Sequence, residues 1–188
     1  IAKIGEEMEG FINPGCDEAS SAFAVQLAEK YDFVYAAVGW HPEELAGIKD
    51  EHYLDKLAAW AVHPKVAAIG EIGLDYYWKE NEPKEVQKKR LLEQIDLAVQ
   101  FDLPVIIHDR EAHGDIFDIV RNEVPNGTRA VFHCYSGSLE MAKELAKRGY
   151  YFGFGDTSNL QKCSQRCVKV LCFCAGRTAG FLKRIRRI

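Results

Sequence analysis

Short apolar runs that each end in an ionisable residue constrain the fold of this chain more than any other feature. The runs are Tyr35–His41, Val66–Glu71, Pro104–His108 and Ala130–His133. A strand rich in Val, Ile, Phe and Ala is buried on both faces, which is typical of a parallel sheet. An ionisable group at the end of such a strand needs a partner that offsets its desolvation. Four such ends therefore predict one shared site where neighbouring strands finish.

Strand-like and helix-like segments alternate about six times with short connections, the pattern of a parallel α/β fold. The expected strands cover 11–15, 33–39, 66–73, 105–108, 129–133 and 150–155. A doubly wound sheet predicts a glycine-rich phosphate turn near the first strand, and none is present. A (β/α)8 barrel instead places its functional residues at the carboxyl ends of several strands. Because a complete barrel needs about 250 residues, we expect an incomplete TIM barrel.

The expected helices follow from capping residues and apolar spacing. The first begins at Asp17 or Ser20, the third begins near Pro83 and reaches about Phe101, and the last is capped by Ser138. The others cover 54–61 and 112–124. The residues expected to face the core are Phe23, Ala24, Leu27, Ala28, Val86, Leu91, Ile95, Leu97, Val99, Ile116, Phe117, Ile119 and Val120.

Charge divides the chain into two segments, 1–156 and 157–188. The second segment holds eight basic residues, no acidic residue and four of the six cysteines, which leaves residues 1–156 a net charge of −12. The cysteines lack the spacing of a disulfide scaffold, so a reducing cytoplasm is expected. The apolar runs are shorter than the roughly 18 residues of a membrane span. Neither a membrane nor an obligate protein partner is therefore predicted.

Glu71, His108 and His133 are the candidate metal ligands, because carboxylate and imidazole are the usual ligands of catalytic divalent cations. Asp75, four residues after Glu71, could reach the same pocket, and His41 could bind a phosphate or a substrate oxygen. Each has a structural alternative: solvated acids in a surface turn for Glu71 and Asp75, a core histidine for His108, and a helix cap for His41. Convergence of the strand ends favours a metal-dependent hydrolase.

Four ordered motifs resemble the TatD family of metal-dependent deoxyribonucleases, within the amidohydrolase-like barrels. They are Val38–Pro42, Gly70–Tyr76, Pro104–Ala112 and Phe132–Gly137, and the likeness runs from about Phe11 to Gly155. The resemblance implies a TIM barrel with a site for two divalent cations (Mg, Mn or Zn). In that site Glu71 bridges the metals, while His108 and His133 bind one of them.

Two parts of the family pattern have no counterpart in this chain. A His-x-His pair would precede Ile1, and an aspartate in a Glu-Thr-Asp-x-Pro-Tyr segment would follow a later strand. With permitted codons, Leu182–Ile188 read in another frame as Glu-Thr-Asp-Ser-Pro-Tyr. We therefore expect a barrel domain over 1–156 that lacks its first strand, and a frame-shifted, basic, cysteine-rich tail over 157–188. Sequencing the gene through this stretch tests the interpretation.

The resemblance implies hydrolysis of phosphodiester bonds in DNA. Two cations would stabilise the attacking and leaving oxygens. Either Asp75 or the missing aspartate would orient the water, and His41 and Arg110 would contact phosphate. Tyr76 lies near the expected rim, where it could bind substrate by stacking on a base, as could Trp40, Tyr77 and Trp78. The charge of 1–156 argues against tight binding of long duplexes. An exonuclease or a repair-type nuclease that accepts single strands or strand ends is therefore expected.

Only part of the family's ligand set is present, so little activity is expected from this chain alone. Two other functions fit the sequence. One is a related barrel hydrolase of a small ester, amide or phosphotriester. The other is a non-enzymatic nucleic-acid-binding protein that uses 157–188 as a basic arm.

Overall fold

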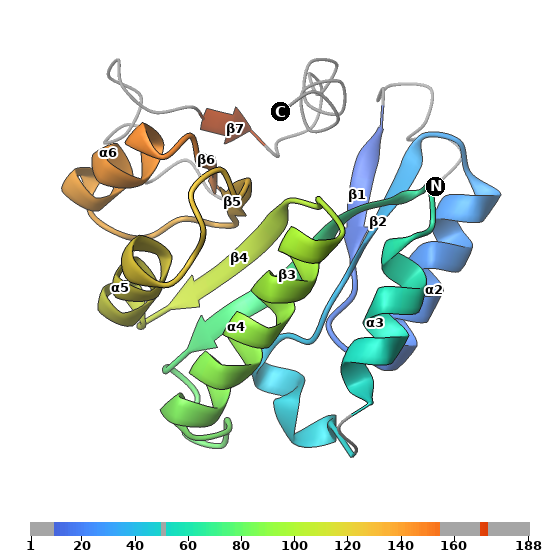
Figure 1. The fold of residues 1–188 in the computed structure, drawn as a ribbon, viewed down its shortest axis with the longest axis horizontal. Helices are drawn as coiled ribbons and strands as arrows, with labels where there is room; N and C mark the ends of the chain where they lie inside the picture. The colour runs from blue at the N-terminus through green and yellow to red at the C-terminus, as the bar shows by residue number, and fades with distance from the viewer. Residues whose placement is uncertain (1–9, 50–51, 155–169, 173–188) are drawn as a thin grey trace.

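The computed structural model describes residues 10–49, 52–154 and 170–172. Its sheet has seven parallel strands that neighbour one another in chain order. The strands are β1 (Phe11–Pro14), β2 (Val34–Val38), β3 (Val66–Asp75), β4 (Val105–Arg110), β5 (Ala130–Phe132), β6 (Tyr151–Phe154) and β7 (Val170–Cys172). This confirms the expected α/β fold, an incomplete parallel barrel (Figure 1).

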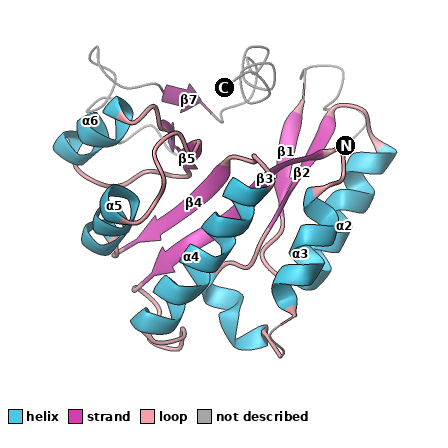
Figure 2. Ribbon diagram, in the orientation of Figure 1, coloured by secondary structure: helices cyan, strands magenta, loops and turns pink. Residues whose placement is uncertain are grey.

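Helices connect the strands. They are α2 (Glu18–Lys30), the 3-10 helix η1 (Pro42–Gly47), α3 (Tyr53–Ala61), α4 (Lys84–Gln100), α5 (His113–Asn122) and α6 (Leu139–Lys147). In Figure 2, α2, α3 and α4 lie side by side over one face of the sheet. Within the described ranges, no helix is both long enough and apolar enough to cross a membrane.

Capping residues begin two helices where the sequence predicts. Asp17 and Ser20 form a capping box at the start of α2, in which the Asp17 side chain accepts from the Ser20 backbone N–H at 2.7 Å. The Ser138 hydroxyl likewise accepts from the Met141 N–H at 3.1 Å. Each cap satisfies a backbone donor that the first helical turn leaves unpaired.

The apolar residues form one large core between the helices and the sheet and a small cluster elsewhere on the sheet. Alternation along β4 separates the two: Ile107 belongs to the large core, whereas its neighbour Ile106 packs with Ala37 and Ala68 in the small cluster. Side chains two residues apart on a strand share a face. His108 therefore lies on the Ile106 face, away from the helix-covered core.

Two residues expected in the core are exposed instead. Phe23 on α2 is 58 % exposed and Val99 on α4 is 43 % exposed. The buried stripe of α2 is Ser21, Ala24, Val25 and Ala28, which follows the i, i+3, i+4, i+7 spacing of one helix face. Phe23 and Val99 fall beside their stripes, so the expectation for these two side chains was wrong.

Most of the 157–188 segment lies outside the described residues. The exception is β7, which pairs with β6 in parallel. The frame-shift interpretation of this segment stays a prediction.

Candidate metal centre and active site

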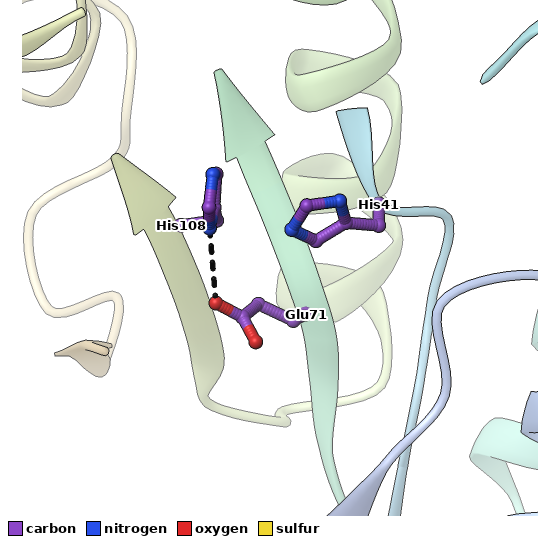
Figure 3. Close-up of side chains that lie close together, drawn as sticks. All are labelled: His41, Glu71 and His108. Carbon is purple, nitrogen blue, oxygen red and sulfur yellow. Dashed lines mark hydrogen bonds and ion pairs between the residues drawn. The ribbon is translucent and has the colours of Figure 1, made fainter. Parts of the chain in front are cut away.

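The candidate site lies in the carboxyl-terminal halves of β3 and β4 and just after β2 and β5. Both β3 and β4 continue past Glu71 and His108, to Asp75 and Arg110, so the expectation that these two residues end their strands was wrong. Glu71 and Asp75 belong to β3, His108 belongs to β4, and His133 directly follows β5. His41 follows β2 and is the N-cap of η1. Because the strands are parallel, their ends lie at one edge of the sheet. Figure 3 shows His41, Glu71 and His108 close together at this edge.

Glu71 contacts both His108 of β4 and His133, which follows β5. Its Oε1 lies 3.3 Å from His108 Nδ1 and 2.9 Å from His133 Nδ1, and the residue is only 7 % exposed. Burial alone would raise the pKa of Glu71, but the hydrogen bonds with His108 and His133 outweigh burial and lower the pKa to about 2. The convergence of positions 71, 108 and 133 that the sequence predicts is therefore observed.

Asp75 approaches His108 from the other side. Asp75 Oδ2 lies 2.9 Å from His108 Nε2, so both ring nitrogens of His108 face carboxylates. Burial alone would lower the pKa of His108, but its hydrogen bonds with Glu71 and Asp75 raise the pKa overall. Imidazole donates from both nitrogens only when it is protonated. A cation bound here would compete with this proton.

His41 completes a group of potential ligands. Its ring centroid lies 4.3 Å from that of His108, and ligand atoms of His41, Glu71 and His108 all lie within 4.8 Å of one another. Burial lowers the pKa of His41 to about 4, with a further contribution from the charge of His108. A neutral imidazole is the form that binds a metal. His41 Nδ1 also accepts from the Glu43 N–H at 3.3 Å, so the helix-cap alternative holds as well.

Glu43 is a site residue that the sequence did not single out. Ligand atoms of Glu43, Asp75 and His108 also lie within 4.8 Å of one another. Burial raises the pKa of Glu43, and the nearby Asp75 raises it further. The sequence signal for Glu43 is its position just after His41-Pro42, in the short helix that the helix-cap alternative for His41 implies.

Two buried glutamines on α4 hold the backbone of the site. Gln87 accepts from the Asp75 N–H at 2.9 Å and donates to the Asp75 carbonyl at 3.1 Å. Gln94 binds Trp40 in the same way, at 2.7 and 3.2 Å, and thereby fixes the residue before His41. The two glutamines are seven residues apart, which is two helical turns on one face. That spacing is the sequence signal for the two contacts.

The aromatic residues expected near the rim separate into two sets. Trp40 is buried and packs edge-on against Tyr53, with ring centroids 6.4 Å apart. The Tyr76 hydroxyl donates to Asp115 Oδ2 at 2.7 Å, so it points to α5 rather than to the histidines. Tyr77 and Trp78 are exposed instead, and the Arg110 guanidinium lies 3.9 Å from the Tyr77 ring centroid.

The comparisons with known proteins agree on one family. A family model described as TatD related DNase matches residues 3–171. The uncharacterized metal-dependent hydrolase YabD of Bacillus subtilis is 40 % identical over 152 residues, which are 80 % of this chain and 58 % of that protein. The 3'-5' ssDNA/RNA exonuclease TatD of Citrobacter koseri is 31 % identical over 146 residues, which are 78 % of this chain and 55 % of that protein.

A solved structure has the same fold. The crystal structure of YjjV, a TatD homologue from Escherichia coli K12, matches with a TM-score of 0.75 and 31 % identity, over 90 % of this chain and 68 % of that chain. This chain thus spans less than two thirds of the length of the two curated relatives above. The matched residues cover most of the chain and include the whole site, and the chain belongs to the TatD family of metal-dependent hydrolases.

Proposed function

We propose that this site hydrolyses phosphodiester bonds of DNA at the ends of single strands, as a metal-dependent exonuclease. The observation that supports this proposal most directly is that Glu71 Oε1 hydrogen-bonds to both His108 and His133, while Asp75 contacts His108 from the other side. A family relative is named as a 3'-5' ssDNA/RNA exonuclease, which supports the choice of a nucleic-acid strand as substrate.

The donor set fits divalent cations. Imidazole and carboxylate suit Zn and Mn, and carboxylate suits Mg as well. We propose that Glu71, His108 and His133 would hold two divalent cations, with Glu43 and Asp75, which are grouped with His108, as the nearest further donors. When bound, such cations stabilise charge on phosphoryl oxygens and make water acidic near neutral pH.

Three side chains of this chain take further roles in the proposal. Asp75, whose Oδ2 contacts His108, would orient the attacking water, and His41, neutral at pH 7, would bind a substrate oxygen or a cation. Arg110, exposed at the end of β4, binds a phosphate. Tyr76, expected to bind substrate, has its hydroxyl engaged by Asp115, so the proposal gives it no contact through that group.

A cleavage assay tests the proposal. We expect the chain with Mn²⁺ to release nucleotides slowly from a labelled single-stranded oligonucleotide, and faster than from a blunt duplex. Chelation should abolish release, and Glu71→Gln should lower the rate about tenfold or more, because the substitution weakens metal binding. Glu93→Gln is the matched control, since Glu93 bonds to Tyr53 and Arg90 on the helix-covered side. It should leave the rate unchanged.

Three outcomes contradict the proposal. The first is hydrolysis of a small ester or phosphotriester with the oligonucleotide left intact, which favours the alternative hydrolase function. The second is nucleotide release that Glu71→Gln does not reduce. The third is binding of DNA without cleavage when the metal is bound, which favours a non-enzymatic role.

A further inference from the structure

Tyr77, Trp78 and Arg110 form an exposed cluster beside the site, here called the aromatic platform. Tyr77 is 51 % exposed and Trp78 is 41 % exposed. Among the described residues, the other exposed large hydrophobic side chains are not neighbours in sequence: Phe23 lies on α2, Val62 follows α3 and Val99 lies on α4. Two adjacent exposed aromatic rings next to a candidate active site call for a functional explanation.

The three side chains of the platform are in mutual contact. The Tyr77 and Trp78 rings meet edge to face, with centroids 4.7 Å apart and an interplanar angle of 89°. The Arg110 guanidinium lies 3.9 Å from the Tyr77 centroid and 5.4 Å from the Trp78 centroid. Contacts of a cation with aromatic faces hold such groups in place. The platform therefore offers aromatic rings and a positive charge in one fixed arrangement.

Asp75 attaches the platform to the candidate metal centre. Its Oδ1 accepts from the backbone N–H of Tyr77 at 3.0 Å and of Trp78 at 3.4 Å, while its Oδ2 contacts His108. The same carboxylate thus faces the platform with one oxygen and the metal centre with the other. In addition, the Tyr76 N–H donates to the Arg110 carbonyl at 2.9 Å, which ties the loop after β3 to β4.

The chemistry of the platform matches an unpaired nucleobase. Aromatic side chains and guanidinium planes stack on bases of any sequence, but only where the base is not paired and stacked in a duplex. Residues 1–156 carry a net charge of −12, which opposes attraction of the phosphate backbone as the main source of affinity. Stacking does not depend on net charge, and Arg110 supplies a local positive charge for the adjacent phosphate.

We propose that the aromatic platform is a base-stacking subsite for the nucleotide next to the cleaved bond, and that it makes the site select single-stranded ends. This inference rests on the proposed nuclease function for its biological meaning. Binding of the strand, however, is measurable without cleavage. The base-stacking proposal and the nuclease proposal can therefore be tested separately.

The test is binding of fluorescein-labelled oligothymidylate, measured by anisotropy in the presence of a chelator so that no cleavage occurs. Tyr77→Ala and Trp78→Ala should each weaken binding about fivefold or more. Trp78→Phe should keep binding within about twofold of the wild-type value, because phenylalanine still stacks. Phe23→Ala is the matched control: it removes another exposed aromatic ring, from α2, and should change nothing.

The outcomes separate the two proposals. Equal binding by wild type, Tyr77→Ala and Trp78→Ala overturns the platform, as does absence of binding by the wild type. Equal losses in Trp78→Phe and Trp78→Ala also overturn it, because the side chain would then matter for local packing rather than for stacking. If the platform variants lose binding while the wild type cleaves no DNA with metal bound, the platform stands and the nuclease proposal fails.

Discussion

At the scale of single residues, the site depends on how closely the backbones of β3 and β4 approach each other, as well as on the side chains that could bind a metal. Gly73 pairs with His108 across β3 and β4. A Cβ atom at position 73 would lie 1.9 Å from the His108 carbonyl oxygen, and Gly73 has φ of +158°. Backbone atoms of a central strand cannot move away cheaply. Glycine at 73 therefore allows the register that brings His108 to Glu71 and Asp75.

Gly73→Ala should lower the free energy of unfolding by more than about 1 kcal/mol, because overlap of the added Cβ with the His108 carbonyl adds to backbone strain. The matched control is Gly127→Ala, where φ is +93° but nothing lies within 4 Å of the added Cβ. That variant should lose only about 1 kcal/mol. Urea unfolding measures both. Equal losses would show that the β3–β4 contact imposes no requirement for glycine.

Asp17 gives the fold a pH-dependent contribution. Hydrogen bonds from the Ser20 side chain and backbone N–H lower the pKa of Asp17 in the folded state. Since the unfolded pKa is about 3.9, the stabilisation is complete above that value and is lost as pH falls through the folded pKa. Asp17→Ala should cost about 1 kcal/mol at pH 7, with a smaller cost at pH 3.

Asp17→Asn provides the control for that measurement, because asparagine caps a helix without titrating. It should keep most of the stability at pH 7, and its stability difference from Asp17→Ala should not change with pH. Thermal or urea unfolding at both pH values gives the comparison. A cost for Asp17→Ala that is the same at pH 3 and pH 7 would exclude the capping charge as its cause.

At the scale of elements, α4 links the core to the site. One face of this helix carries apolar residues and the two glutamines that bind the backbone of Asp75 and Trp40. Because both glutamine amides are buried, each hydrogen bond is made in a region of low dielectric. The helix therefore sets the positions of two strand ends at once.

Gln94→Leu should destabilise the fold by about 1–3 kcal/mol, because the Trp40 N–H and carbonyl are left buried without partners. It should also weaken metal binding, since Trp40 precedes His41. Gln100→Leu, at the exposed end of the same helix, should stay within about 0.5 kcal/mol of the wild type. If the two variants behave alike in urea unfolding, the Gln94 contacts contribute nothing to stability.

Sequence reasoning succeeded where one physical rule dominates and failed where tertiary contacts decide. The doubly buried strands and the caps at Asp17 and Ser138 follow from local rules, and they are observed. Gln87 and Gln94 were missed because periodicity treats glutamine as exposed. Trp40 was expected at the rim and is buried, because its ring packs against Tyr53 on α3.

At the scale of the whole molecule, the site is local although the sheet is long. Glu71, Asp75, His108, His133 and His41 come from four consecutive strands or their exits, and these strands pair directly with one another. The described contacts among these five residues do not involve β6 or β7. We therefore expect the metal centre to form in this chain even though the chain spans only part of the length of its relatives.

Metal content after dialysis against Mn²⁺ or Zn²⁺ and gel filtration tests this central claim most directly. We predict that the wild type retains the cation and that Glu71→Gln and His108→Asn lower retention about tenfold or more. Glu93→Gln and His63→Asn are matched controls, because Glu93 lies on α4 and His63 precedes β3 at its opposite end. Both controls should retain metal like the wild type. Retention by Glu71→Gln and His108→Asn that equals the wild-type value would contradict the account.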